Sequence, residues 1–400
     1  MYTPSSELLK KYADVLVRFA LNSGAGMKKG ETVQVVVPES AKPFYVPLRT
    51  SILEAGGNVI MQFIPDEVGA ADMLMQMSAK QLDFFPSKYF KGLIDEIDHS
   101  IIILSQADKF ELKDVPPEKL MRRQKAMLPY RVWRDTKEGK GKFTWTLALY
   151  GTPAMAKDVH MTEEEYWEQI AAACYLNEPN PIAKWQEVQK ELERVRAGLN
   201  ELAIDSLHVE APEIDLIVGL GKNRHWLGGS GRNIPSFELF ISPDWRRTNG
   251  TISFNQPLYT HGQRITGIKL VFKDGLIVEA SAKENEGLLK EMIATEGANR
   301  IGEFSLTDGR LSQITKPMGE TLFDENMGGP EGNTHLAIGN AYKDSFPGDQ
   351  AAVTAEEWEI MGYNESVVHT DIISTAPRTV TAMLPNGSTK VIYQAGKFLI

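Results

Sequence analysis

The sequence is very poor in cysteine, because Cys174 is the only one among its 400 residues. An intrachain disulfide and a thiolate metal cluster are therefore excluded, and the composition fits a reducing compartment. The chain also has no run of about eighteen apolar residues that could cross a bilayer. Its first residues, Met1 to Lys11, are polar and lack the apolar core of a signal peptide. We therefore expect a soluble, cytoplasmic protein with no membrane partner.

Positive charge is in deficit as well. The chain has 43 Lys and Arg against 53 Asp and Glu, which gives a net charge of −10, and no block of basic residues is long. These features argue against nucleic acid as a partner. The hydrophobic content of 42% and the charged content of 24% are those of an ordinary globular protein, and the length suggests two or three domains.

The first half alternates between helix-like and strand-like segments. Apolar residues recur at helical spacing over about residues 5–20, behind Ser5 and Ser6, which can cap a helix. Four short apolar runs, most of them rich in β-branched residues, predict strands at residues 31–37, 58–64, 100–104 and 143–150. Helical segments separate these runs, so the pattern predicts a mostly parallel sheet flanked by helices.

The second half is more β-rich. Two helices are predicted first: one opens with a capping box at Thr162 and Glu165, and the other covers about residues 182–202. Short strands then dominate, with hairpin turns at Asp274-Gly275 and Asn386-Gly387. We predict an α/β chain with two domains. Residues 1–200 form an N-terminal α/β domain, and residues 201–400 form a C-terminal, β-rich α+β catalytic domain.

Two features that could suggest other chemistry fail on inspection. The glycines of Gly219-Leu-Gly221 and Gly228-Gly-Ser-Gly231 do not have the spacing of a dinucleotide or phosphate loop, so we interpret them as turns. Cys174 lies in an Ala-rich helical segment, where a small buried hydrophobe is the better interpretation than a nucleophile.

Two of the seven histidines lie in informative surroundings. His369 and Asp371 belong to a strand-like run, and their i,i+2 spacing puts both side chains on one face of the strand, where they can share a cation. His335 follows a loop rich in glycine and polar residues and leads into an apolar run. Taken singly, each is weak evidence, because His-x-Asp is frequent by chance.

Two glutamates add to this picture. Glu238 and Glu303 each interrupt an apolar, strand-like run. A carboxylate is costly to bury unless it is paired or bound to metal. Strand alternation could instead turn either side chain to solvent.

Taken in their order and spacing, these motifs resemble the metal-dependent aminopeptidases typified by aminopeptidase T and aminopeptidase S. The motifs are Asn233-Ile-Pro-Ser-x-Glu238, Ser242-Pro-Asp244 with Gly250, Gly302-Glu303, Asp324-Glu-Asn326 before His335-Leu-Ala-Ile-Gly339, Tyr342, and Asn364-x-Ser366-x-x-His369-x-Asp371. Segments near residues 12–17, 30–33 and 54–59 are similar to the family as well, so the resemblance covers essentially the whole chain.

The resemblance implies a two-domain homodimer that hydrolyses the N-terminal peptide bond of peptides with a free N-terminus. It implies two divalent cations, for which zinc, cobalt and manganese are the candidates. The implied metal ligands are Glu238, Glu303, His335, His369 and Asp371. Tyr342 is implied near the metals, and Glu303 is a candidate general base.

One departure from the family leaves alternatives open. Family members usually carry two adjacent glutamates where this chain has Phe237-Glu238. Loss of that carboxylate would suit a non-catalytic, peptide-binding relative. A mononuclear non-haem iron dioxygenase on the same scaffold is another alternative, since it would need only His335, His369 and Asp371. Retention of both Glu238 and Glu303 favours two metals and hydrolysis.

Overall fold

The computed structural model describes residues 2–65 and 69–400, which form two compact units. The first unit comprises the chain up to Glu187 together with Ser230–Ser236 and His261–Gln263. The second comprises Val188–Gly229, Phe237–Thr260 and Arg264–Ile400. Domain limits at 1–200 and 201–400 stay a prediction.

The first unit is built on a five-stranded sheet with the order β2-β1-β3-β4-β7, in which every pair is parallel. Alternate valines of β1 at positions 33, 35 and 37 are fully buried, as expected for a parallel strand covered on its faces. The strands are β1 (Thr32–Pro38), β2 (Asn58–Ile64), β3 (His99–Leu104), β4 (Thr144–Leu149) and β7 (Asn233–Ile234).

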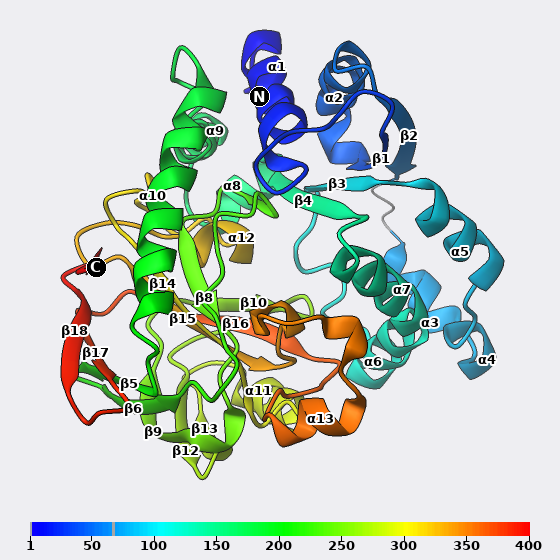
Figure 1. Ribbon diagram of the computed structural model, residues 1–400. Helices are drawn as coiled ribbons and strands as arrows, with labels where there is room; N and C mark the ends of the chain where they lie inside the picture. Colours follow the sequence, from blue (N-terminus) through cyan, green and yellow to red (C-terminus); the bar gives the residue numbers. More distant parts are fainter. Residues whose placement is uncertain (1, 66–68) are drawn as a thin grey trace. The chain divides into compact units, whose positions relative to one another are not determined.

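Helices cover both faces of this sheet (Figure 1). The chain passes from β1 to β2 in one direction and from β2 through β3 to β4 in the other, so right-handed crossovers put α2 on one face and α5 and α7 on the opposite face. The helices are α1 (Ser6–Val15), continued by a π-helical turn (Leu16–Ala20), α2 (Lys42–Glu54), α3 (Ala70–Gln76), α4 (Ala79–Leu82), α5 (Ser87–Glu96), α6 (Pro117–Ala126), α7 (Leu128–Gly139), α8 (Pro153–Asp158) and α9 (Glu163–Ala173).

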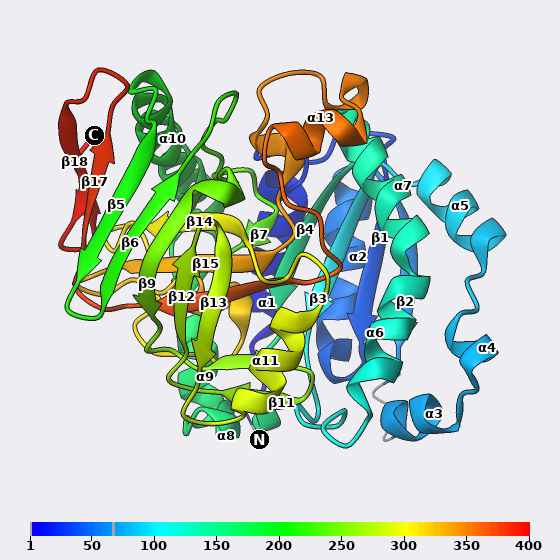
Figure 2. The ribbon, with the colours of Figure 1, turned by 90° about the horizontal axis from the view of Figure 1, so that it is seen from below.

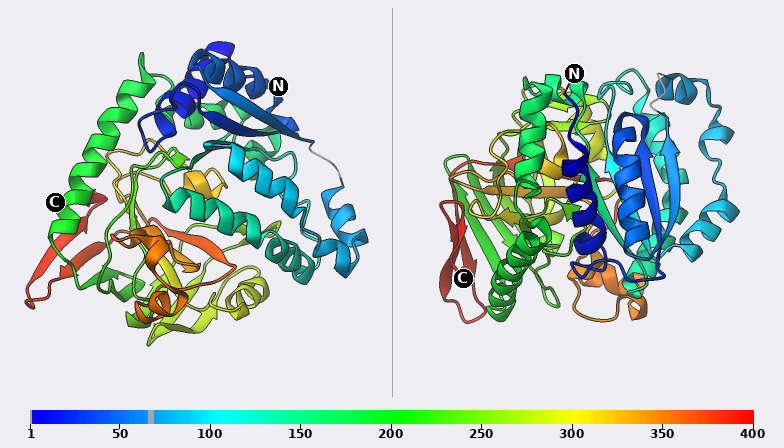
Figure 3. Two further views of the ribbon diagram at one scale, coloured as in Figure 1. Left: turned by 45° about the vertical axis from the view of Figure 1, so that its right-hand side comes forward. Right: turned by 90° about the horizontal axis from the view of Figure 1, so that it is seen from above.

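The basic residues of α6 and α7 serve the fold of this unit. Lys119 donates to the carbonyl of Leu74 at 2.9 Å, and Lys137 donates to the carbonyl of Ile94 at 2.7 Å. These carbonyls lie in the last turns of α3 and α5, where a cation satisfies free acceptors and complements the helix dipole. Helices α5 and α7 lie side by side (Figure 3).

The second unit holds two antiparallel sheets. The larger has eight strands in the order β13-β12-β9-β6-β5-β17-β18-β19 (Figure 2), and the smaller has four in the order β16-β15-β14-β8. Both predicted hairpin turns are present, since Asp274-Gly275 joins β12 to β13 and Asn386-Gly387 joins β17 to β18. The strands of the larger sheet are β5 (Ser206–Ala211), β6 (Ile214–Gly219), β9 (Thr248–Ser253), β12 (Lys269–Lys273), β13 (Leu276–Ser281), β17 (Thr379–Met383), β18 (Thr389–Gln394) and β19 (Lys397–Phe398).

The remaining elements are shorter or join these parts. The helices are α10 (Pro181–Glu201), α11 (Glu286–Ala294), α12 (Thr321–Asp324) and α13 (Ala355–Ile360), and a two-stranded ribbon is formed by β10 (Leu258–Thr260) and β11 (Gln263–Ile265). The predicted fold class is confirmed: a parallel sheet with helices in the N-terminal part and a β-rich α+β C-terminal part. Within the described residues, no helix combines the length and apolarity that a membrane crossing requires.

Candidate metal centre

The four-stranded sheet brings the predicted site residues together. Its strands are β8 (Glu238–Ile241), β14 (Ile301–Thr307), β15 (Asn333–Gly339) and β16 (His369–Ser374). Ala337 of β15 pairs with Glu303 on one side and with Asp371 on the other, and the same strands pair His335 with Ser305 and with Ile373. Because residues two apart along a strand share a face, this register aligns the site side chains on one face of the sheet. The strand β8 adds Glu238, opposite Thr307.

Small residues leave room on that face. Ala337 lies between Glu303 and Asp371, and Ser305 lies between Phe240 and His335. The larger site side chains can therefore lean toward one another over a methyl and a hydroxymethyl group. The fully buried strands β14 and β15 hold this arrangement.

A bulge in β14 sets the position of Glu303. The register with β15 shifts between Ile301 and Glu303, so Gly302 is the extra residue. A Cβ atom at Gly302 would lie 2.2 Å from the carbonyl oxygen of Asn340. Only glycine permits this close approach, which explains the Gly-Glu sequence locally.

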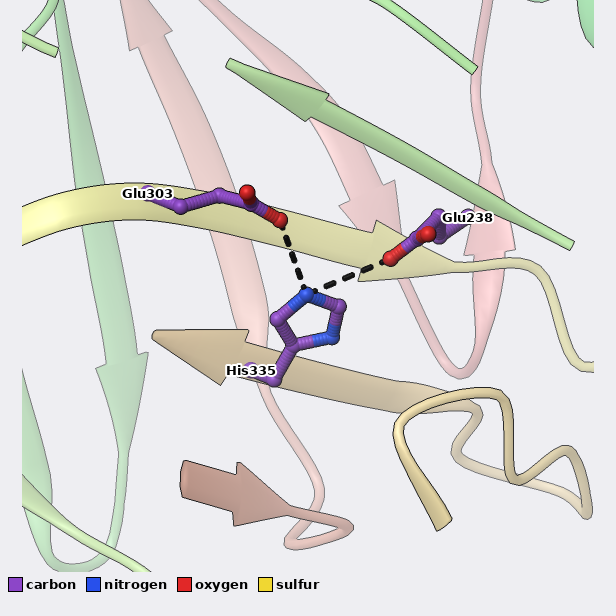
Figure 4. Close-up of side chains that lie close together, drawn as sticks. All are labelled: Glu238, Glu303 and His335. Atoms are coloured by element: carbon purple, nitrogen blue, oxygen red, sulfur yellow. Dashed lines mark hydrogen bonds and ion pairs between the residues drawn. The ribbon is translucent and has the colours of Figure 1, made fainter. Parts of the chain in front are cut away.

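His335 is at the centre of the cluster (Figure 4). Its Nε2 atom lies 3.0 Å from Oε1 of Glu303, 3.2 Å from Oε2 of Glu238 and 3.8 Å from Oδ1 of Asp371. Both glutamates are buried, with exposed fractions of 7% for Glu238 and 3% for Glu303. Strand alternation therefore does not turn either carboxylate to solvent.

His369 completes the cluster from β16. Its Nε2 atom lies 3.6 Å from Oδ1 of Asp371 and 3.9 Å from Oε2 of Glu303. Its Nδ1 atom lies 2.8 Å from the carbonyl oxygen of Asn340. A carbonyl can only accept, so Nδ1 carries the proton and Nε2 faces the carboxylates. The ring of Tyr342 packs edge-on against this imidazole, with ring centroids 4.8 Å apart.

The charges of the cluster shift its protonation equilibria. Burial opposes the charged imidazole of His335, but the hydrogen bond to Glu303 and the charges of Glu238 and Asp371 outweigh it and raise its pKa to about 10. For His369, burial is likewise outweighed, mainly by Asp371, and the pKa rises to about 9. Burial raises the pKa of Glu238 to about 7, although His335 opposes the rise. The three carboxylates of the cluster thus carry more negative charge than its two imidazoles can neutralise.

The cluster fits a divalent cation. One donor atom each from Glu238, Glu303 and His335 lie within 4.8 Å of one another. Within the described part of the chain, Oε2 of Glu303, Oδ1 of Asp371 and Nδ1 of His335 are buried without a hydrogen-bond partner. Buried carboxylate oxygens in this state are costly unless a cation compensates them. Imidazole and carboxylate donors suit zinc, cobalt or manganese.

Glu325 is a buried acidic residue to which the sequence motifs assign no role. It follows α12 and has an exposed fraction of 6%. Burial raises its pKa well above the usual value, and the charges of Glu238 and Asp371 raise it further. It is therefore a further acidic group in the electrostatic field of the cluster. Its place in the Asp324-Glu-Asn326 motif was the available signal.

Phe237, the departure from the family pattern, is fully buried beside the cluster. Its backbone N–H donates to Oδ1 of Asn326 at 2.6 Å. The asparagine of the Asp324-Glu-Asn326 motif thus anchors the chain at the entry to β8. Glu238, the next residue, reaches the cluster.

Cys174 and the two glycine-rich segments have surroundings that fit their structural interpretation. Burial raises the pKa of Cys174 to about 12, which makes it a poor nucleophile. Gly219 ends β6, and Gly228 to Gly231 lie in the loop before β7, so neither segment opens a helix.

Comparison with known proteins decides the family. The model of the thermophilic metalloprotease (M29) family matches residues 5–398. The chain belongs to this family. The match confirms the predicted family and the predicted class of enzyme, a metalloprotease.

Relatives of this M29 chain are similar over their whole length. It is 29% identical to aminopeptidase T of Thermus aquaticus, with 99% of each chain covered. It is 30% identical to aminopeptidase PepS of Streptococcus thermophilus, with 98% of each covered. Among solved structures, wild-type AmpT from Thermus thermophilus is similar, with a TM-score of 0.83, 27% identity, and coverage of 98% of this chain and 99% of that one.

Proposed function

We propose that this chain is an aminopeptidase that hydrolyses the N-terminal peptide bond of peptides with a free N-terminus, using two divalent cations. The carrying observation is the group of three carboxylates and two imidazoles, buried or half-buried, on one face of the small sheet. Full-length similarity to proteins named aminopeptidases supports the choice of reaction.

The proposed ligands are Glu238, Glu303, His335, His369 and Asp371. Glu303 is the carboxylate between the two imidazoles, since its Oε1 lies near His335 and its Oε2 faces His369. One carboxylate oxygen would thus bind a cation while the other stays open to a proton. When bound, two such cations lower the pKa of a coordinated water and stabilise the oxyanion that forms at the peptide carbonyl.

The other roles fall to this chain's own groups. Glu303 can take a proton from water at whichever carboxylate oxygen is not engaged as a ligand. Tyr342, held against His369, can donate its phenol proton in a hydrogen bond to the developing oxyanion. Ser305 donates to Oε2 of Glu238 at 3.3 Å and so helps to fix that carboxylate. A homodimer and a cytoplasmic location remain predictions from the sequence.

The test is a metal count followed by activity assays. Purified protein is analysed for metal, and hydrolysis of Leu- and Arg-p-nitroanilide is measured with and without chelator. About two equivalents of metal and chelator-sensitive hydrolysis support the proposal. One iron with oxygen uptake on a hydroxylated aromatic compound would instead indicate the dioxygenase alternative. Metal without turnover would indicate the non-catalytic relative.

A further inference from the structure

The segment after β15, residues 340–342, carries two groups of the cluster. Asn340 supplies the carbonyl that accepts the Nδ1 proton of His369, and Tyr342 supplies the ring that packs on the same imidazole. The segment lies close against the chain before β16: the N–H of Asn340 donates to the carbonyl of Val368 at 2.7 Å, and a Cβ at Gly339, whose φ is +99°, would lie 2.1 Å from that carbonyl oxygen. The position of this segment therefore bears on the orientation of His369.

Asn364, in the segment before β16, holds residues 339–341 in place through hydrogen bonds. Its side-chain amide donates to the carbonyl of Gly339 at 2.5 Å and to that of Gly297 at 2.7 Å. Its backbone carbonyl accepts the N–H of Ala341 at 2.8 Å. Asn364 thus bonds the chain on both sides of Asn340, at Gly339 and at Ala341. Its exposed fraction is only 2%.

The guanidinium of Arg300 fixes the orientation of the Asn364 side-chain amide. Arg300 donates from Nη1 to Oδ1 of Asn364 at 3.3 Å. Since guanidinium can only donate, the oxygen of the amide faces Arg300 and the NH₂ group faces the two carbonyls. The guanidinium is itself held over the ring of Trp245, 4.0 Å from its centroid.

We propose that Asn364 is a positioning residue of the metal centre: it holds the Asn340 carbonyl in place for the Nδ1 proton of His369 and so directs Nε2 toward Glu303 and Asp371. This inference rests on the metal centre of the proposed function. Hydrogen-bond partners that orient a ligand histidine typically change metal affinity 10- to 100-fold when they are lost. Asn364 acts one step further out, through a backbone carbonyl.

The experiment compares Asn364→Asp with a control away from the cluster, Asn200→Asp. The aspartate keeps the size and the acceptor of Asn364 but removes both amide donors. Asn200 also bonds a backbone pair, since its Oδ1 accepts the N–H of Trp226 at 2.8 Å and its Nδ2 donates to that residue's carbonyl at 3.5 Å. Asn200 is exposed and touches no residue of the cluster in these bonds, so it reports the cost of losing such bonds away from the cluster, while Asn364→Ala reports that loss without a buried charge.

Two measurements follow, neither of which needs a peptide substrate. In metal-free protein labelled with ¹⁵N-histidine, the Nδ1 proton of His369, assigned by its loss in His369→Gln, is expected to be protected from exchange with water. Asn364→Asp should speed this exchange at least about tenfold and weaken zinc binding about 10- to 100-fold in a chelator competition. Asn200→Asp should leave both within about twofold of wild type.

Two outcomes overturn the proposal. One is a folded Asn364→Asp protein with wild-type proton exchange at His369 and wild-type zinc affinity. The other is an equal loss in Asn200→Asp. Asn364→Ala, which introduces no charge, repeats the measurements and decides the matter if the aspartate variant does not fold. Absence of peptide hydrolysis in wild type would refute the proposed function while leaving the proton-exchange result intact.

Discussion

His335 and Glu303 face each other across neighbouring strands, with Nε2 of the imidazole 3.0 Å from Oε1 of the carboxylate. They do so although they are not paired in the register, where Glu303 pairs with Ala337 and His335 with Ser305. The contact is therefore diagonal, and it depends on the small residues that separate the two side chains.

Removal of a proposed ligand should lower activity strongly. We expect Glu303→Ala and His369→Ala each to lower kcat/KM for Leu-p-nitroanilide at least about 100-fold, because each removes a proposed ligand. Circular dichroism should show a retained fold. The exposed substitution Glu284→Ala is the control and should leave turnover unchanged. Wild-type turnover in either site variant would remove that residue from the site.

Metal removal should make stability depend on pH. The raised pKa values of His335, about 10, and His369, about 9, exceed the value of about 6.5 for an unfolded histidine. Between about pH 6.5 and 9, the folded chain then holds protons that the unfolded chain releases, so the stabilisation present at low pH is lost as pH rises. The free energy of unfolding should fall by about 1.4 kcal/mol per pH unit for each extra proton held.

Urea denaturation in chelator at pH 7, 8 and 9 measures this slope. Saturating zinc should suppress it, since metal binding requires the neutral imidazole. The variant His335→Gln should reduce it. A free energy of unfolding that stays constant or increases over this range in chelator would contradict the assignment of excess protons to the imidazoles.

Filling the face of the sheet should block metal binding without destroying the fold. Ala337 lies between Glu303 and Asp371, so Ala337→Leu places a bulky group among the ligands at a cost of about 1–3 kcal/mol for overpacking. Zinc binding, measured by chelator competition, should be lost. Leu336→Met on the opposite face is the control, with an expected cost below about 1.5 kcal/mol and unchanged zinc binding.

Glu325 should tolerate replacement by its neutral isostere. Its pKa is raised well above the usual value by burial and by the charges of Glu238 and Asp371, which favours the protonated acid. We expect Glu325→Gln to leave the stability of the metal-free protein within about 1 kcal/mol of wild type, or to raise it. Glu325→Ala should cost more, because it leaves a cavity. Strong destabilisation by Glu325→Gln would mean that the folded protein needs the ionised form.

Restoring the family's usual glutamate at position 237 should harm this protein. Phe237 is fully buried, so Phe237→Glu loses a packed ring and buries a carboxylate, at a cost of about 3 kcal/mol or more. We expect lower stability and no gain in activity. Phe237→Leu, which keeps an apolar side chain, should cost less. A stable and more active Phe237→Glu protein would show that the missing carboxylate has a catalytic role here.

Local signals in the sequence were sufficient for many elements, whereas the proposed ligands were named as one set only through the resemblance to the family. The strand at residues 58–64 and the capping box at Thr162 are present as predicted, because alternation and cap chemistry act over a few residues. The stretch between the third and fourth predicted strands, by contrast, favours one helix at about residues 118–130, whereas the structure has two, since α6 ends at Ala126 and α7 begins at Leu128. Pro129, near the start of α7, was the local signal.

Features that depend on distant residues could not be predicted. The short strand β7 pairs with β4 although more than eighty residues separate them in sequence. The role of Asn340 was hidden for the same reason. It acts through its backbone carbonyl, and every residue has a backbone carbonyl. The burial of Glu325 was hidden as well, because a carboxylate in a polar, glycine-rich stretch is ordinarily solvated, and only its place in the Asp324-Glu-Asn326 motif pointed to it.

The proposed ligands come from four strands whose residues run from Glu238 to Asp371, and this spacing has a consequence for synthesis. A chain still on the ribosome lacks its last ligand until nearly all of the molecule has emerged, and the sheet must then close contacts between distant segments. The complete five-ligand centre cannot form before that point. A metal centre built from these residues would thus form late, only after the four strands have paired.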